Sequence, residues 1–276
     1  METRTLPKPE PLAVINDSNQ CKLLDMFNRI FIIFIVSTFS FLTSSLCKAE
    51  DHKDSLEVLF VGNSYTYMEN LPQIVSIISE STKIKLVTTK SVAGGARLKD
   101  HWNGNRGLRT KQLIEKGKYD IVILQGQSMA AINEPDSLRK YSDLFCQFVV
   151  DNGAKPFLFT TWARKKVPQY QDIINHVYTK ISTENNATML PIGDAWKLAK
   201  QLRPDIEIFS FDGSHPNKLG TFLTACIIVG TITDEIPQKI TSIYKTFDKF
   251  DESILLMYVD PLDVTFCKKV TEEILK

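Results

Sequence analysis

Ser64, Asp212 and His215 are the residues of this chain whose types and spacing could do chemistry together. Ser64 follows an apolar run and a Gly62-Asn63 turn, which predicts a serine at the carboxyl end of a buried strand. A serine hydroxyl is a weak nucleophile and needs a base that a third group orients. Asp212 and His215 are three residues apart in one Gly- and Pro-containing loop, so both could face Ser64. The spacing predicts acyl transfer, with His215 as the base and Asp212 as its orienting partner.

Acyl transfer also needs donors for the developing oxyanion, each typically worth about 3 kcal/mol of barrier. The candidates follow strands at the same predicted sheet edge: the backbone N–H groups of Ser64 and Gly95, and the side-chain amide of either Gln127 or Gln125. Nothing in the spacing decides between the two glutamines.

Aromatic residues near these points are candidate walls of a substrate pocket. Trp162 follows the fourth predicted strand, and Tyr65 follows the serine. Either ring could line a sugar or acyl pocket, or pack on the end of the sheet. Two other histidines, His101 and His176, lie in polar contexts where a solvated imidazole is expected.

The elements that position these residues follow a strand–helix alternation. Strands are predicted at 56–61, 84–89, 120–124, 156–160 and 188–191, and helices at 71–81, 108–116, 135–152, 169–185, 194–202, 219–233 and 261–276. The segment 219–233 is apolar nearly all round and is expected to be a buried helix. This alternation predicts an α/β fold, a three-layer α/β/α sandwich with a flavodoxin-like parallel five-stranded sheet.

The first 49 residues are predicted to lie outside that domain, which would span 50–276. Residues 30–42 form a charge-free apolar run, preceded by Arg29 and followed by small residues up to Ala49. This pattern is typical of a signal peptide, with Met26 as a candidate true start and an uncleaved anchor as the alternative. We therefore expect an extracytoplasmic protein, secreted or periplasmic, whose contact with a membrane would be limited to this segment.

Composition excludes several classes of function. The 33 basic and 32 acidic residues nearly cancel, which argues against nucleic acid as a partner. Cysteines at 146, 226 and 267 lack metal-site spacing and are expected as buried free thiols, so no metal is predicted. No GxGxxG or Walker loop supports a nucleotide, and no cofactor is expected.

The blocks 62–66 (Gly-Asn-Ser-Tyr-Thr), 94–95 (Gly-Gly) and 212–217 (Asp-Gly-Ser-His-Pro-Asn) resemble those of the SGNH, or GDSL-type, serine hydrolase superfamily, with a GNS first block. The resemblance covers about residues 56–235 and implies an SGNH hydrolase fold. It also implies Ser64 as nucleophile, Asp212 and His215 as the other triad members, and Gly95 as an oxyanion donor. The superfamily's third-block asparagine is replaced, and Gln127 or Gln125 would supply its amide.

These observations predict an exported serine esterase that hydrolyses an ester through a Ser-His-Asp triad. Its substrate would be a small-molecule or carbohydrate ester, and the resemblance suggests O-acetyl groups on carbohydrate. The alternatives are a lipase or thioesterase for longer acyl chains, and a non-catalytic extracytoplasmic binding protein on the same scaffold.

Overall fold

The computed structural model describes residues 53–238 and 240–276, and Lys53–Lys276 form a compact unit. The predicted N-terminal extension and signal peptide lie outside the described residues. No helix among the described residues has both the length and the apolar character needed to cross a membrane.

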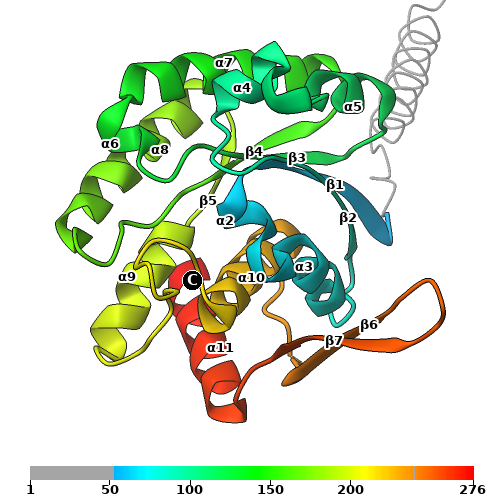
Figure 1. Cartoon of the computed structure of the whole chain (residues 1–276), viewed down its shortest axis with the longest axis vertical. Coiled ribbons are helices and arrows are strands. Elements are labelled where there is room, and N and C mark those ends of the chain that lie inside the picture. Colours follow the sequence, from blue (N-terminus) through cyan, green and yellow to red (C-terminus); the bar gives the residue numbers. More distant parts are fainter. Residues whose placement is uncertain (1–52, 239) are drawn as a thin grey trace, which may run out of the picture. The chain divides into compact units, whose positions relative to one another are not determined.

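The core of this unit is a parallel sheet with strand order β2-β1-β3-β4-β5 (Figure 1), so the predicted flavodoxin-like topology is confirmed. The strands are β1 (Ser55–Gly62), β2 (Lys85–Val92), β3 (Ile121–Gln125), β4 (Lys155–Phe159) and β5 (Thr188–Leu190). All five residues of β3 are buried, because helices cover both faces of a central parallel strand. Along β1 the side chains alternate, so that Val58 and Phe60 enter one core and Leu59 and Val61 the other.

Helices form a layer on each side of the sheet (Figure 1). One layer contains α3 (Leu71–Ser79), α9 (Ile192–Leu202), α10 (Lys218–Thr233) and α11 (Pro261–Leu275), and the other contains α4 (Leu98–Asn103), α5 (Thr110–Lys116), α7 (Pro135–Asp151) and α8 (Gln171–Glu184). The short helices α2 (Ser64–Tyr67) and α6 (Ala130–Asn133) follow β1 and β3. The three-layer prediction is thus confirmed, and α10 is the buried helix expected from its apolar sequence.

A hairpin of β6 (Ile243–Phe247) and β7 (Ser253–Tyr258) was not predicted from the sequence. Only Tyr244 and Met257 of these strands are fully buried, so the alternation that marks a half-buried strand is too short to recognise. The predicted buried thiols Cys146, Cys226 and Cys267 are buried and free of disulfide bonds.

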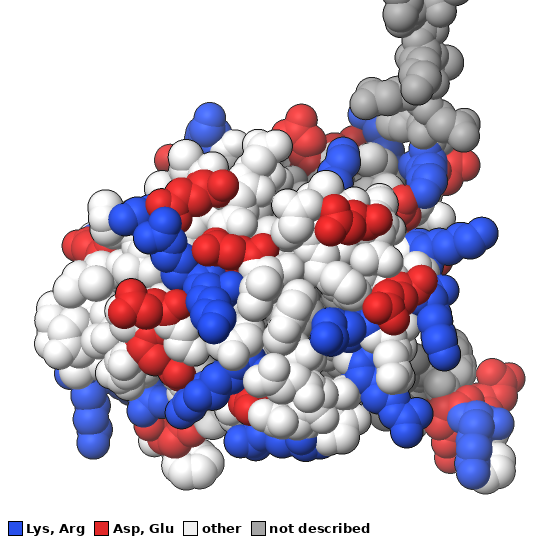
Figure 2. All heavy atoms as spheres, turned by 90° about the horizontal axis from the view of Figure 1, so that it is seen from above, with Lys and Arg blue, Asp and Glu red and all other residues white. Residues whose placement is uncertain are grey.

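On the face of the molecule that Figure 2 shows, Lys and Arg side chains are interspersed with Asp and Glu side chains.

Candidate active site

The carboxyl end of β1 carries Ser64 into the first turn of α2. Gly62 ends the strand, and Asn63, in an extended conformation, caps the helix by accepting the N–H of Tyr65 at 3.1 Å. Ser64 is therefore the first residue of a helix that begins directly from a buried strand. A side chain at Gly62 would come within 2.3 Å of Thr66 Oγ1 and 2.6 Å of Gln125 Oε1, so this turn has no room for a β-carbon.

Asn63 connects this turn to the loops that follow β2 and β3. Its side-chain amide donates to the carbonyls of Ala96, at 2.9 Å, and Gly126, at 3.5 Å. Gln125, at the end of β3, holds the same turn because its Oε1 accepts the Asn63 N–H at 2.9 Å and the Thr66 hydroxyl at 3.0 Å. The nucleophile candidate is thus fixed by hydrogen bonds from two neighbouring strand ends.

The three predicted triad residues are in contact. The Oγ of Ser64 lies 2.8 Å from Nε2 of His215, and Nδ1 of His215 lies 2.5 Å from Oδ2 of Asp212. The structure therefore brings together residues that are 151 positions apart in the chain, in the order serine, histidine, carboxylate. This is the geometry that a base needs to take the serine proton while a carboxylate orients the imidazole.

Asp212 is held as a carboxylate by its surroundings. Partial burial raises its pKa, but the hydrogen bonds from the His215 side chain and from the backbone N–H groups of Ser214 and His215 outweigh burial and lower the pKa to about 2. Those two N–H groups bind Oδ1 at 2.9 and 3.0 Å, which leaves Oδ2 for the imidazole. The carboxylate is therefore ionised at neutral pH and fixed in orientation.

The loop that carries Asp212 and His215 is closed on itself. Ser210 donates its N–H to the His215 carbonyl at 2.8 Å, and Gly213, with φ of 65°, donates to Ser210 at 2.9 Å. Asn217 then caps α10 by accepting the Gly220 N–H at 3.0 Å. The loop thus ends in a buried helix, which fixes its position relative to the sheet.

Two aromatic residues hold Ser214, next to the histidine. The Tyr65 hydroxyl lies 2.8 Å from Ser214 Oγ, and Nε1 of Trp162 donates to the Ser214 carbonyl at 2.9 Å. The rings form a parallel stack: Tyr65 and Trp162 have centroids 4.4 Å apart, and Trp162 and Trp196 3.9 Å apart. Tyr65 also meets the His215 ring edge-on, with centroids 5.5 Å apart.

Of the two alternatives that the sequence left open for Tyr65 and Trp162, this stack favours packing on the end of the sheet. Tyr65 is 2% exposed and Trp162 1% exposed, so neither offers a ring face to a ligand as a pocket wall would. Tyr65 instead supports the Asp212–His215 loop, and Trp162 does so while its edge borders a separate cavity. Trp196, which the sequence did not single out, completes the stack from α9.

The oxyanion-donor candidates differ in their exposure to solvent and in the hydrogen bonds that they already make. Gly95 has φ of 64° and is exposed, a β-carbon added to it would meet no atom within 4 Å, and its N–H makes no backbone hydrogen bond within the described residues, so it remains open as a donor. Gln125 is fully buried, and its amide group donates to the Gly126 carbonyl while its oxygen holds Asn63 and Thr66. Gln127 is partly exposed, and its amide donates to Ser128 Oγ at 3.1 Å. These contacts favour Gln127 over Gln125.

His101 is buried, contrary to the solvated imidazole expected from its polar neighbours. Its Nε2 lies 2.9 Å from the Gly62 carbonyl and its Nδ1 lies 2.7 Å from the Thr110 hydroxyl. Burial lowers the pKa of His101, although the bond to Gly62 opposes that effect. The neutral imidazole therefore braces the residue at which β1 ends.

The site as a whole is open to solvent. Ser64 and His215 are partly exposed, and Asp212, Gly94 and Gly95 are exposed. Because these residues are accessible at the surface, a small chemical group attached to a large molecule could reach Ser64 and His215.

Solved structures share this fold. A DUF4886 family protein from Bacteroides uniformis is similar at 17% identity and a TM-score of 0.63, covering 80% of this chain and 94% of that chain. A proposed SGNH hydrolase from Slackia heliotrinireducens is similar at 21% identity and a TM-score of 0.55, covering 64% of this chain and 99% of that one. The acetyl xylan esterase AlAXEase is similar at 18% identity and a TM-score of 0.50, and the match covers 64% of this chain and 100% of that chain.

These likenesses establish the architecture. The described domain has the SGNH-hydrolase fold, and its structural neighbours include hydrolases and esterases. No protein-family model matches the chain. No curated protein matches it either.

Proposed function

We propose that this protein is a serine esterase in which Ser64 is the nucleophile, His215 the general base and Asp212 the residue that orients His215. The observation that carries the proposal is the continuous contact from Ser64 Oγ to His215 Nε2 at 2.8 Å and from His215 Nδ1 to Asp212 Oδ2 at 2.5 Å. The SGNH-hydrolase fold of the domain supports the same reading.

The proposed reaction has two steps. Ser64 Oγ attacks the ester carbonyl carbon while its proton passes to His215 Nε2, and the tetrahedral intermediate collapses as His215 returns that proton to the leaving alcohol. A water molecule, deprotonated by His215, then attacks the acyl-serine, and Ser64 recovers its proton as the carboxylic acid departs. The N–H groups of Ser64 and Gly95 and the amide of Gln127 would stabilise the oxyanion in both steps.

The proposed substrate is a short acyl ester, such as an O-acetyl group on a carbohydrate. Support comes from the exposure of the site: Ser64 and His215 are accessible at the surface, where an acetyl group on a polymer could reach them. Similarity in fold to an acetyl xylan esterase fits this choice of substrate. Longer acyl chains, as a lipase or thioesterase would take, are the alternative.

Labelling with a fluorophosphonate probe tests the nucleophile. We expect the wild type to label and Ser64→Ala not to label, whereas Ser253→Ala, at an exposed serine of β7, should label like the wild type. A wild type that fails to label beside an authentic serine esterase would favour a non-catalytic binding protein on this scaffold.

Hydrolysis of p-nitrophenyl esters from acetate to palmitate tests the acyl length. We expect kcat/KM to be highest for acetate and to fall as the chain lengthens. A maximum at long chains would replace the acetylesterase proposal with the lipase or thioesterase alternative, and would leave the assignment of Ser64 intact.

We further propose that the protein acts outside the cytoplasm, on the basis of the apolar run at 30–42 and the small residues up to Ala49. Cell fractionation of the full chain tests this localisation, and recovery in the cytoplasm alone would exclude it. Mass spectrometry of the mature N-terminus would separate cleavage near Ala49 from an uncleaved anchor.

A further inference from the structure

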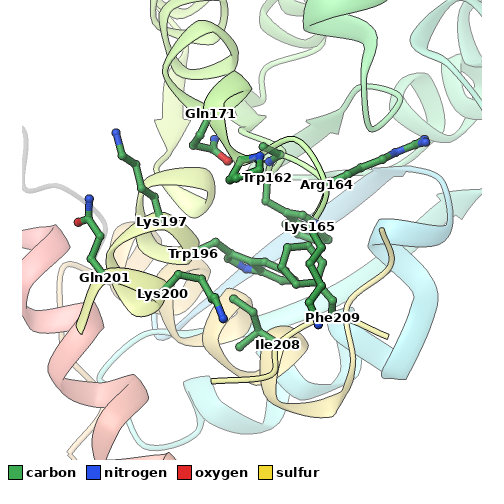
Figure 3. A pocket seen from close by; sticks show the side chains of 12 residues that line it. Trp162, Arg164, Lys165, Gln171, Trp196, Lys197, Lys200, Gln201, Ile208 and Phe209 are labelled. Carbon is green, nitrogen blue, oxygen red and sulfur yellow. Dashed lines mark hydrogen bonds between the residues drawn. The ribbon is translucent and has the colours of Figure 1, made fainter. Parts of the chain in front are cut away.

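A cavity of about 320 Å³ is bordered by Trp162 and Trp196, two members of the aromatic stack (Figure 3). Its volume is at the lower end of the range of about 300–1,000 Å³ that is usual for small-molecule sites. Ser64 and His215 do not line it. The cavity is therefore a place for a small ligand that is distinct from the reacting atoms.

The walls of this cavity are mainly apolar. The apolar surface that a ligand could reach comes from Phe209, from the exposed Pro168 and from the aliphatic stems of the lining lysines, and the buried residues Trp162, Trp196 and Ile208 lie beneath it. Such walls suit the apolar body of a small molecule better than a hydroxyl-rich sugar.

Three lysines lie around the cavity, and their pairing differs. Lys165 pairs with Glu207, and Lys197 pairs with Asp172. Lys200, on α9, donates to two backbone carbonyls, Pro204 at 2.6 Å and Ile206 at 2.9 Å. These bonds leave one of the three ammonium protons of Lys200 for another acceptor. Lys165 and Lys197 are thus each paired with a carboxylate, and among the three lining lysines Lys200 is the one that the described residues leave without a carboxylate partner.

The position of Lys200 makes that charge available to a ligand. Figure 3 shows its amino group extending toward Ile208 along the cavity, whereas Arg164 extends away from the cavity. Arg164 instead donates to Ser128 Oγ at 3.0 Å. The ammonium group of Lys200 is therefore placed beside mainly apolar walls, which is the complement of an apolar body that carries a single anionic group.

We propose that this cavity binds a small apolar monocarboxylate, with the carboxylate on Lys200 and the apolar body against Phe209 and Pro168. The site goes beyond the proposed esterase activity and does not depend on it, because binding here involves no step at Ser64. Two of its wall residues also hold the triad loop: Trp162 bonds the Ser214 carbonyl and the Lys165 N–H bonds the Gly213 carbonyl.

Ligand-observed NMR titration of the whole protein with hydrocinnamate and its neutral amide, 3-phenylpropanamide, tests the proposal. The two probes have the same apolar body and differ in charge. We expect hydrocinnamate to bind with a Kd of roughly 1 mM, at least about fivefold more tightly than the amide. Tryptophan fluorescence offers a second readout, because two of the three tryptophans line the cavity.

Variants of lining residues distinguish binding in this cavity from nonspecific binding elsewhere on the protein. Lys200→Met should abolish the preference for the acid. Gln201→Glu, at an exposed lining residue, should weaken hydrocinnamate several-fold and leave the amide unchanged, because it adds a negative charge without altering the bonds of Lys200. Lys180→Met, at an exposed lysine of α8 outside the lining, should behave like the wild type.

The proposal is overturned if the wild type binds acid and amide equally, or if neither probe binds up to about 20 mM. A folded Lys200→Met variant that keeps the preference for the acid would also overturn it. Should Lys200→Met fail to fold, the Gln201→Glu result decides: unchanged binding of hydrocinnamate would refute the site. Loss of esterase activity in any assay would not bear on these outcomes, because the titration measures binding alone.

Discussion

The two hydrogen bonds that hold Ser214 should set the activity of the proposed triad. Trp162→Phe removes the Nε1 donor, 2.9 Å from the Ser214 carbonyl, and keeps a ring between Tyr65 and Trp196. Tyr65→Phe removes the hydroxyl, 2.8 Å from Ser214 Oγ, and keeps the other stacked ring. Each change therefore frees one side of the residue next to His215 while the aromatic packing largely remains.

The magnitudes follow from what each variant loses. Leaving a buried polar group without its partner costs about 1–3 kcal/mol of stability, so unfolding midpoints should fall in both variants. A displacement of a catalytic group by about 1 Å can cost roughly 10²-fold in rate, so we expect kcat on p-nitrophenyl acetate to fall about 10- to 100-fold. The double variant should lose less than the product of the two effects, because both bonds act on one residue.

The assay must separate misplacement of His215 from loss of folded protein. Fluorophosphonate titration gives the active fraction, and kcat is then expressed per labelled site. Thermal unfolding monitors stability, and Phe266→Leu, at a partly buried position packed on the core away from the stack, provides a control for destabilisation alone. If both variants unfold earlier yet keep kcat within about twofold of the control, the stack is only structural and the reasoning fails.

Three further predictions concern residues of the candidate site and of the turn that carries Ser64. The folded pKa of Asp212 is about 2, below its usual 3.8, so its ionised form stabilises the fold above pH 3.8. That stabilisation is lost as the pH falls through about 2. The urea midpoints of wild type and Asp212→Asn should therefore converge on acidification. Gln127→Leu should lower kcat about 10²–10³-fold with little change in KM, whereas the control Gln169→Leu, at an exposed residue, should keep the wild-type kcat. If Gln127→Leu and the wild type have equal kcat, Gln127 is not an oxyanion donor. Gly62→Ala should destabilise the domain by about 1–3 kcal/mol in chemical denaturation, since the new methyl group would meet Thr66 and Gln125, and a neutral result would show that the turn can relax.

The sequence predicted the sheet, and it pointed to the three residues that the structure brings into contact, because the signals for both are local and strong. β3 is a continuous aliphatic run, and Asp212 and His215 share one short loop, so neither prediction needed knowledge of distant contacts. Pairing Ser64 with that loop rested on the resemblance of the two blocks to those of SGNH hydrolases, because the loop precedes α10 and does not follow a strand of the sheet. These are patterns in which residue type and spacing alone restrict the structure.

The supporting residues could not be predicted in the same way, because long-range packing decides their roles. His101 lies in a polar stretch, yet it is buried by contact with the Gly62 carbonyl, 39 residues earlier. Trp196 lies in a helix with an ordinary amphipathic pattern, and only the tertiary fold places it on Trp162. The choice between Gln125 and Gln127 likewise depends on which side chain faces inward, and spacing along the loop leaves that open.

The asparagine of the GNS block has a physical reason that emerges only from these contacts. At 2% exposure, Asn63 accepts the Tyr65 N–H through its oxygen and donates through its nitrogen to the Ala96 and Gly126 carbonyls. An aspartate could make the first bond but would set a carboxylate oxygen against two carbonyl oxygens in a buried place, which is unfavourable unless it is protonated. An asparagine suits this position because the loops after β2 and β3 each direct a carbonyl, from Ala96 and Gly126, at its side chain. Asn63 therefore has two roles: its side-chain oxygen caps α2, the helix that begins with Ser64, and its side-chain nitrogen binds the loops that carry Gly95 and Gln127.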